Sequence, residues 1–460
     1  MTDKHTVWDK QGAAYKLTGK IGEGGQGTVC KTQMPNVLVK VSNFAKDDSR
    51  TLGWYKQLQS VMRQPLKDLH IAQPRALIVK PRLGYVMELM DGLEPLQALV
   101  EEAHLSMIDG KGLVGFVASG GLRRRLTILS NAARLLAKLH GRALAYGDLS
   151  PSNIFVSQTK DRGEVWLIDC DNLAVLSREG GQKLYTPEYG APEILQGISG
   201  INSLTDSWSF AVIAFQLLTL LHPLKGDLVT EGEEDLGNAA LRGLLPWIDH
   251  PEDRRNASTH GLPRDDVLTD RLRQLFGRCF GQGLADPEFR PSMTEWAEAF
   301  EEALAITVSC KDEEGCGNTF LFNRERKCPF CDSVQAESLC IRLRHYLFIS
   351  PKDFGMDTCP KDRVLSTGHI QVIEREAMLE LRSSPVGTST YLESPIVCRL
   401  RLTAGNLWIE ALNDEVITFV SKSGTTLKIR KKESVKAQAS DSLLHIGDIE
   451  KTHSVWRFWW

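Results

Sequence analysis

A glycine-rich turn near the start of the chain restricts the fold more than any other stretch. Residues 21–29 read IGEGGQGTV and place Gly22, Gly24 and Gly27 in a G-x-G-x-x-G pattern between two stretches with strand-like alternation. Glycine lets a backbone approach phosphate oxygens closely and adopt positive φ without a Cβ clash. A strand rather than a helix follows Gly27, which excludes a dinucleotide-binding βα fold. A plain hairpin turn and a phosphate-covering loop remain as alternatives.

One lysine lies inside the next apolar strand. Lys40 is part of VLVKV, residues 37–41, thirteen positions after Gly27. An inward-facing lysine needs an anionic partner, and nucleotide phosphates would supply one. The alternative is an edge-strand lysine whose amine points to solvent. The pair of glycine turn and lysine strand therefore favours a nucleotide site without establishing it.

The order of predicted elements indicates a strand-rich lobe followed by a helix-rich lobe. From Arg123 to His140 the apolar residues recur at helical spacing, and further helices continue to about residue 306. Strands are expected near residues 15–21, 28–33, 37–41, 76–80 and 84–89, and helices near 47–62, 207–221 and 271–280. The fold class expected for this part of the chain is α+β.

Three polar residues with chemistry-bearing side chains come after the strand-rich lobe in the sequence. Residues 146–155 read YGDLSPSNIF, with Asp148 and Asn153 five positions apart, and Asp169 follows in the sequence DCD. Together with the glycine turn and Lys40, this order resembles the eukaryotic-like protein kinase family over residues 12–306. The resemblance implies a bilobal fold that binds ATP and Mg²⁺ between its lobes.

The later part of the same region carries the resemblance further. The sequence Ala191-Pro192-Glu193 is similar to the motif that ends the family's activation segment, and Arg290 is similar to the arginine that pairs with its glutamate. Asp206 is similar to a buried aspartate at a helix start. The resemblance also places Thr186 near the substrate hydroxyl.

The resemblance assigns a chemical role to each residue of the set. Asp148 would accept or orient the proton of the attacking hydroxyl, while Asn153 and Asp169 would hold Mg²⁺. Lys40 would contact the α- and β-phosphates of ATP. The residues expected to surround ATP are Ile21, Gly22, Gly24, Gly27, Val29, Lys40, Met87, Glu88, Met90 and Phe155.

Two departures from the family pattern affect the catalytic loop. Tyr146 and Gly147 replace the usual His-Arg, which removes the cation that binds an activation-loop phosphate in many relatives. Ser150 stands where serine/threonine kinases usually carry a lysine near the γ-phosphate. Phosphate-driven ordering of the activation segment is therefore less expected in this chain.

Two further departures affect the metal and lysine positions. Cys170 and Asp171 replace the usual Phe-Gly after Asp169, and Asp171 adds a second carboxylate close to the metal. Residues 49–65, where a helix glutamate should pair with Lys40, contain no acidic residue. Gln57 and Gln59 are the neutral candidates for that place.

The charge-bearing residues are retained although their partners are altered, which favours an active enzyme. The expected function is an atypical serine/threonine protein kinase that acts on a protein substrate with ATP and Mg²⁺. The first alternative is a pseudokinase or nucleotide-binding scaffold that acts through its C-terminal parts. A small-molecule kinase is the second alternative, because the lysine that usually stands at Ser150 is missing.

Four cysteines lie close together after the kinase-like region. They follow the spacing Cys310-x5-Cys316-x11-Cys328-x2-Cys331. Two thiol pairs separated by a short hairpin suit tetrahedral Zn²⁺, so residues 307–335 are expected to form a structural zinc ribbon. A redox pair or free thiols are the alternatives. The other six of the ten cysteines are scattered, which is typical of reduced thiols in the cytoplasm.

Residues 338–460 show repeated strand patterns and are expected to form a small β-sandwich or barrel. Helical periodicity is limited there to a short stretch near residues 375–381. The final stretch resembles the last strands of forkhead-associated domains. Large aromatic residues close the chain and would be costly to expose, so we expect them to dock onto the kinase region or a partner: Trp456, Phe458, Trp459 and Trp460.

Charge and architecture bear on partners and location. The formal charge of −3 over 460 residues gives no reason to expect nucleic acid or an anionic membrane as a partner. The most apolar segment, of about twelve residues, is too short to span a bilayer, and we expect a cytoplasmic protein. A kinase followed by a cysteine ribbon resembles bacterial kinases encoded with a PP2C-type phosphatase and a von Willebrand-type protein in tellurite-resistance-like clusters. That resemblance implies both proteins as partners.

Overall fold

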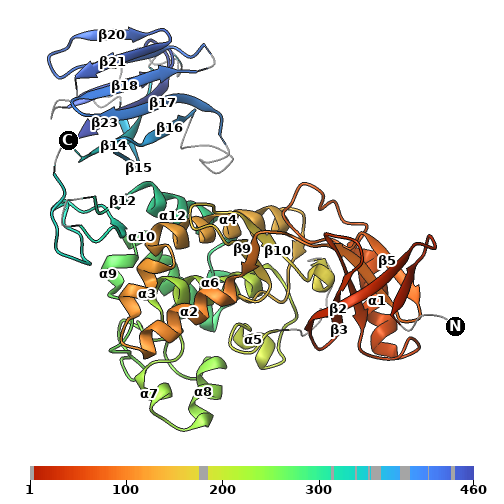
Figure 1. The fold of residues 1–460 in the computed structure, drawn as a ribbon. Coiled ribbons are helices and arrows are strands. Elements are labelled where there is room, and N and C mark those ends of the chain that lie inside the picture. The colour runs from red at the N-terminus through yellow and green to blue at the C-terminus, as the bar shows by residue number, and fades with distance from the viewer. Residues whose placement is uncertain are drawn as a thin grey trace. The chain divides into compact units, whose positions relative to one another are not determined.

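Two compact units make up the chain (Figure 1). The computed structural model describes residues 5–175, 185–311, 315–336, 339–350, 353, 364–383, 394–412, 414–436 and 441–459. The first unit comprises Met1–Gly115, Asn131–Gly261 and Gln274–Met293. The second unit comprises Phe116–Ser130, Leu262–Arg273 and Thr294–Trp460.

A closed barrel of strands begins the first unit. Its strands follow the order β1-β2-β3-β4-β6-β5, and β1 (Thr6–Asp9) pairs with both β2 and β5. The other strands are β2 (Ala14–Glu23), β3 (Gly27–Thr32), β4 (Val37–Ser42), β5 (Ala76–Lys80) and β6 (Gly84–Glu88). Apolar side chains from these strands fill part of the interior: Val7, Val39, Val41, Ile78 and Val86. The five predicted strands are confirmed, whereas the four-residue β1 was not predicted.

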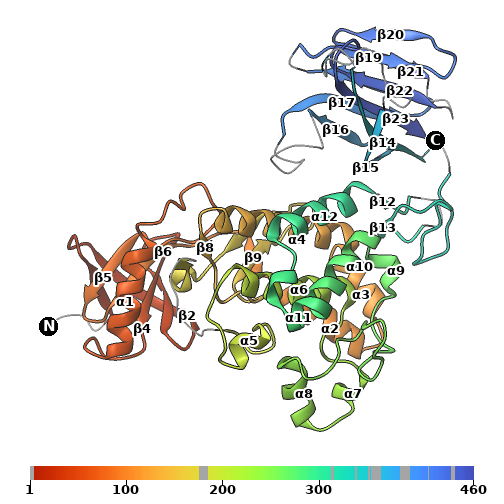
Figure 2. The same ribbon diagram turned by 180° about the vertical axis from the view of Figure 1, so that it is seen from behind.

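Helix α1 (Ser49–Val61) packs against this barrel, as Figure 2 shows. Asp48 caps its N-terminus by accepting a hydrogen bond from the Arg50 amide. Trp54 and Leu58 are buried on its inner face, where they contact apolar side chains of the strands: Leu38, Leu77, Tyr85 and Met87. The helix predicted at about residues 47–62 is confirmed. Its apolar face packs on the barrel, which places Trp54 on the side of the helix near Lys40.

Helices form most of the remaining first unit. They are α2 (Leu96–Ile108), α5 (Pro192–Leu195), α6 (Ser203–Thr219), α7 (Asp227–Thr230) and α8 (Glu234–Leu241), while α3 (Gly112–Ala118), α4 (Gly121–His140) and α10 (Asp270–Gly277) have residues in both units. Helix α6 is almost wholly buried and begins with a capping box between Asn202 and Thr205. The mixture of strands and helices expected from the sequence is present.

Short antiparallel strands hold the loops that carry the candidate catalytic residues. Strand β9 (Ile154–Ser157) pairs with β7 (Leu93–Pro95) and β10 (Val165–Leu167), while β8 (Leu144–Ala145) pairs with β11 (Ala174–Val175). The loop with Asp148 therefore runs from β8 to β9, and the loop with Asp169 runs from β10 to β11. Both loops are fixed at each end by the same set of strand pairs.

The second unit contains a two-sheet β-sandwich. One sheet has the order β15-β14-β23-β22-β19-β20 and the other the order β16-β17-β18-β21. Side chains from both sheets share one core, including Leu343, Leu400 and Trp456. The strands are β14 (Cys340–Phe348), β15 (Val364–Glu374), β16 (Met378–Arg382), β17 (Ile396–Thr403), β18 (Asn406–Ala411), β19 (Ile417–Val420), β20 (Thr426–Ile429), β21 (Lys432–Lys436), β22 (Ser442–Ile446) and β23 (His453–Trp459).

Two expectations for this region are wrong. The stretch near residues 375–381 is not helical, because Leu379 and Leu381 alternate toward the core and β16 pairs with β17. The docking expectation is wrong for Trp456 and Phe458, which are 0% and 1% exposed because they pack inside the sandwich itself. Trp459 is half-buried on the same strand, and Trp460 lies outside the described residues.

The second unit also holds helices α9 (Arg264–Val267) and α12 (Met293–Ala305) and a small hairpin. The hairpin pairs β12 (Thr307–Ser309) with β13 (Thr319–Leu321) in the region of the cysteine cluster. Among the described residues, no helix is both long enough and apolar enough to cross a membrane.

Candidate active site

Asp148 and Asn153 lie in one loop and are held in defined orientations. Asp148 Oδ1 accepts a hydrogen bond from the Thr186 hydroxyl at 2.7 Å. Asn153 donates its side-chain amide to the Asp148 carbonyl at 2.9 Å, and this leaves the Asn153 amide oxygen as the group for another ligand. Burial raises the pKa of Asp148, while the Thr186 hydrogen bond opposes that rise. The loop thus presents one oriented carboxylate and one amide oxygen.

Two buried residues, Tyr146 and Asp206, hold this loop in place through hydrogen bonds. The backbone amides of Tyr146 and Gly147 donate to the two carboxylate oxygens of Asp206 at 2.6 and 2.9 Å. The Tyr146 hydroxyl donates to the Ile168 carbonyl, next to Asp169. Asp206 is 1% exposed in the first turn of α6, as predicted. Tyr146 therefore joins the two catalytic loops in place of the usual histidine.

Gly147 is required by its surroundings. Its φ is +95°, and a Cβ there would lie 2.8 Å from the Ile201 side chain and 3.1 Å from the Asn172 carbonyl oxygen. An L residue with this positive φ is strained, and its Cβ would displace the Ile201 side chain. The arginine that the resemblance would place here is therefore disfavoured by the local backbone and packing.

Lys40 points inward from β4, so the solvent-facing alternative is wrong. The residue is 4% exposed, and its amine contacts the carboxylates of Asp169 and Asp171, the latter at 3.0 Å. Burial lowers the pKa of Lys40, but the two carboxylates outweigh it and raise the pKa above its ordinary value. The expected glutamine partners do not contact the amine; Gln57 instead donates to the Leu173 carbonyl at 2.5 Å.

The two aspartates of the DCD sequence differ in their environment. Asp169 adopts a left-handed conformation with φ 57°, and its side chain is 30% exposed. The Asp171 side chain is 0% exposed and accepts a hydrogen bond from the Trp54 indole nitrogen at 2.6 Å. Burial and the neighbouring Asp169 raise the pKa of Asp171. Asp169 is therefore the carboxylate that a metal ion can reach.

The glycine turn leaves space for a ligand. Nothing lies within 4 Å of the position that a Cβ would take at Gly22 or Gly24. A Cβ at Gly27 would meet the Val41 carbonyl oxygen at 2.7 Å, so strand pairing alone requires this glycine. The backbone at Gly22 and Gly24 is therefore open to close approach by a ligand such as phosphate.

The other residues expected around ATP lie on the same strands and loops. Met87 is buried, while Val29, Met90 and Phe155 are half-buried. Ile21 is 49% exposed at the end of β2. Glu88 is exposed and forms an ion pair with Arg75 at 2.9 Å. The set thus includes three half-buried apolar side chains and the buried Met87, as an adenine-binding surface needs.

The end of the activation segment is tied to the helices. Arg290 forms two hydrogen bonds with the Glu193 carboxylate, at 2.7 and 2.8 Å, so the predicted pair is confirmed. The Tyr189 hydroxyl donates to the Gln216 side chain at 3.1 Å. These contacts tie residues 189–193 to α6 and to the segment that carries Arg290.

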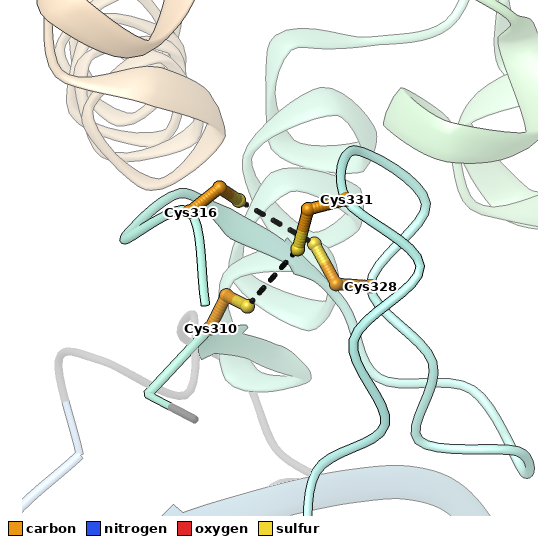
Figure 3. A group of neighbouring side chains, drawn as sticks. All are labelled: Cys310, Cys316, Cys328 and Cys331. Carbon is orange, nitrogen blue, oxygen red and sulfur yellow. Dashed lines mark hydrogen bonds between the residues drawn. The ribbon is translucent and has the colours of Figure 1, made fainter. Parts of the chain in front are cut away.

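The four cysteines meet in the second unit, as Figure 3 shows. Their sulfur atoms all lie within 4.8 Å of one another, with Cys310–Cys331 at 3.6 Å and Cys316–Cys328 at 3.8 Å. Zn–S bonds of about 2.3 Å in a tetrahedron place sulfurs about 3.8 Å apart. The donor set and its spacing therefore fit Zn²⁺.

Sequence reasoning missed one residue of the site and the contacts of another. Trp54 was not identified, although it occupies the buried face of the helix that lacks an acidic residue. The expectation that Asp171 lies close to the metal stays a prediction, and its hydrogen bonds from Lys40 and Trp54 were not foreseen. The signal that could have found both is the combination of a missing helix acid and an additional carboxylate two residues after Asp169.

Comparison with known proteins relates this region to one family. The model of the protein kinase domain matches residues 15–299. Myosin light chain kinase A of Dictyostelium discoideum is 27% identical over 239 residues, covering 49% of this chain and 73% of that protein. Serine/threonine-protein kinase 17A of Oryctolagus cuniculus is 34% identical over 201 residues, covering 37% and 50%.

A bacterial protein shows the same relationship over a shorter stretch. Serine/threonine-protein kinase pkn2 of Myxococcus xanthus is 28% identical over 134 residues, covering 27% of this chain and 16% of that protein. The chain thus spans about three quarters of the Dictyostelium kinase and half or less of the other two relatives.

Proposed function

The chain belongs to the protein kinase domain family, and from that premise we propose that it is a serine/threonine protein kinase. It would transfer the γ-phosphate of ATP to a protein hydroxyl in the presence of Mg²⁺. The observation that carries the proposal is the convergence of Lys40, Asp169 and the Asp148–Asn153 loop in one unit. These are the charges and ligands that phosphoryl transfer requires.

The chain offers a place for each part of the nucleotide and its metal. Asn153 and Asp169 would hold Mg²⁺ through an amide oxygen and a half-accessible carboxylate. The glycine turn and Lys40 would hold the phosphates. When bound, the metal and nucleotide supply the transferable phosphoryl group and neutralise charge that develops on it.

Asp148 would orient the substrate hydroxyl and accept its proton. Its raised pKa makes the carboxylate a better proton acceptor at neutral pH than an exposed aspartate. Thr186 holds one oxygen of this carboxylate, so the other is directed to the incoming hydroxyl. Tyr146 and Asp206 keep the loop in register with Asp169. Positioning rather than strong base chemistry is thus the contribution of these residues.

Control by activation-loop phosphate is not part of the proposal. A side chain at position 147 would be strained by the positive φ and crowded by Ile201, and Gly147 itself cannot bind phosphate as the usual arginine does. We propose instead that partners control the activity, and the architectural resemblance suggests a PP2C-type phosphatase and a von Willebrand-type protein. Pull-down of these two proteins from a host that encodes all three would test this part.

We also propose a three-part organisation, with a kinase domain at 12–306, a zinc ribbon at 307–335 and a β domain at 338–460. The cysteine sulfur spacing supports a structural Zn²⁺, and the shared core of two sheets supports a β-sandwich of the forkhead-associated kind. Metal analysis of the purified chain should find about one zinc per molecule. A zinc content near zero after purification without chelators would overturn the ribbon.

A nucleotide-binding scaffold is the second candidate. The observation that favours it is Ser150, which is 1% exposed and cannot itself supply the charge that a lysine at this position brings to the γ-phosphate. Purified chain should be incubated with labelled ATP, Mg²⁺ and generic protein substrates, beside Asp148→Ala and Asp169→Ala. Label on protein that is lost in both variants supports the kinase. Nucleotide binding without any protein label supports the scaffold.

A further inference from the structure

The lysine partner that the kinase fold needs does not come from helix α1. Residues 49–65 contain no aspartate or glutamate. The residue of α1 that lies nearest the lysine is Trp54, whose ring centroid is 6.0 Å from Lys40 Nζ. An indole carries a hydrogen-bond donor and no acceptor, so it cannot pair with an ammonium group as a carboxylate does.

A carboxylate from the activation segment fills the gap between lysine and helix. Asp171 Oδ2 accepts from Lys40 Nζ at 3.0 Å and from Trp54 Nε1 at 2.6 Å. The Asp171 side chain is 0% exposed. A buried carboxylate is costly unless donors satisfy it. Two donors converge on Oδ2, whereas Oδ1 is buried and accepts no hydrogen bond from the described residues. The three side chains come from β4, α1 and the turn after β10.

We propose that Asp171 is the positioning residue of Lys40, with Trp54 as the residue that couples helix α1 to it. This inference rests on the proposed kinase function. The negative charge that holds the lysine has moved from the helix to the activation segment, and the helix now contributes the donor. Lys40 therefore retains a carboxylate partner in addition to Asp169, which stays available for the metal.

A second role for Asp171, as an additional metal ligand, fits the geometry less well. Its Oδ2 already accepts two hydrogen bonds, and its side chain is fully buried. Asp169 is 30% exposed by comparison, and its Oδ1 also lies 3.4 Å from the Tyr85 hydroxyl. Lys40 thus contacts both aspartates, but only Asp169 is exposed enough to take a metal ion as well.

The arrangement also links helix α1 directly to the activation segment. Gln57, one turn after Trp54, donates to the Leu173 carbonyl at 2.5 Å. Two hydrogen bonds therefore join α1 to residues 171–173, and both depend on how that segment folds. Correct placement of Lys40 would therefore depend on residues 171–173 being folded against α1.

Steady-state kinetics of the full chain test the inference by comparing the wild type with variants at Asp171 and Trp54. Asp171→Asn removes the charge and keeps the shape, and Trp54→Phe removes the indole donor and keeps the ring. The double variant Trp54→Glu with Asp171→Asn returns a carboxylate to the helix, since a glutamate side chain reaches about as far as the indole nitrogen. Matched controls are Trp408→Phe on β18 and Asp161→Asn in an exposed loop.

The expected result is a drop in kcat of about tenfold or more for Asp171→Asn, the size of one hydrogen bond to a charged group. Trp54→Phe should also lower kcat. The double variant of Trp54→Phe with Asp171→Asn should be little slower than Asp171→Asn alone, because both substitutions act through one contact. Trp54→Glu should recover part of the loss. A merely structural Asp171 would give no recovery, which would overturn the proposal, as would unchanged kcat and KM in Asp171→Asn.

Two further readouts keep the outcome decisive. Thermal melting of each variant separates loss of folding from loss of positioning, and Trp54→Phe provides the answer if Asp171→Asn does not fold. If the wild-type chain transfers no phosphate, the proposed function fails. The Kd for Mg-ATP then decides the inference alone, because a misplaced Lys40 weakens binding in Asp171→Asn and Trp54→Glu restores it. Equal Kd values in all forms would contradict it.

Discussion

The ion pair that ends the activation segment offers a sharp test of the packing in the first unit. Arg290 is buried with 0% side-chain exposure, and Glu193 is 11% exposed. The guanidinium also donates to the Gly283 and Leu204 carbonyls at 2.9 and 3.1 Å and lies 4.8 Å from the Trp208 ring centroid. We predict that Glu193→Gln destabilises this unit strongly.

The size of the effect follows from the burial of the pair. Glutamine keeps the shape of glutamate but leaves the Arg290 charge buried without a counter-ion, which costs about 3 kcal/mol. For a unit of this size, each kcal/mol shifts the melting temperature by about 2–3 °C. The first unit of Glu193→Gln should therefore melt about 6–9 °C below the wild type.

Differential scanning calorimetry of the full chain measures this shift, and hydrogen exchange of peptides from residues 190–200 locates it. Glu188→Gln is the matched control, because Glu188 pairs with Lys225 at the surface with 44% and 28% exposure. An exposed pair contributes about 0–1 kcal/mol, so the control should shift by no more than about 3 °C. Equal shifts in the two variants would refute the reasoning.

Three other perturbations have defined outcomes. Gly147→Ala should destabilise the first unit by about 1–3 kcal/mol of backbone strain, because φ at this residue is +95° and the Ile201 side chain is close. Both the melting temperature and kcat should fall, as calorimetry and kinetics would measure. Burial lowers the pKa of His345 to about 3 and that of His369 to about 4, against about 6.5 in the unfolded chain. The free energy of unfolding of the β-sandwich should therefore be highest above pH 6.5 and fall by about 3 kcal/mol per histidine as the pH drops toward 4. Hydrogen exchange of β14 and β15 measures this loss. Cys328→Ser should abolish zinc binding and open residues 307–335 to protease, as metal analysis and limited proteolysis would reveal.

Features that depend on local pattern or family order could be predicted from the sequence. The β-branched run VLVKV indicated the strand that carries Lys40, and the five-residue step from Asp148 to Asn153 indicated one loop. The Arg290–Glu193 pair spans 97 residues and was still predicted, because the family resemblance supplies the long-range contact. These residues keep the family's types, so the contact followed directly.

Features that depend on replaced residues could not be predicted in the same way. Asp171 reaches Lys40 because Asp169 adopts a left-handed φ of 57° and a short turn follows, and no sequence pattern encodes that direction. Trp456 has the same alternation whether its strand packs inside the sandwich or against a partner, so its burial could not be read from the sequence. The four residues of β1 are too few for a periodic signal.

The initial rate of γ-phosphate transfer from labelled ATP to a protein substrate tests the central claim most directly. It should be measured at saturating Mg-ATP for the wild type and for Asp148→Asn, which keeps the size of the side chain. We expect protein-bound label with the wild type and a transfer rate at least about 100-fold lower with the variant. Equal rates in the two forms, or bound nucleotide with no label on any protein, would contradict it.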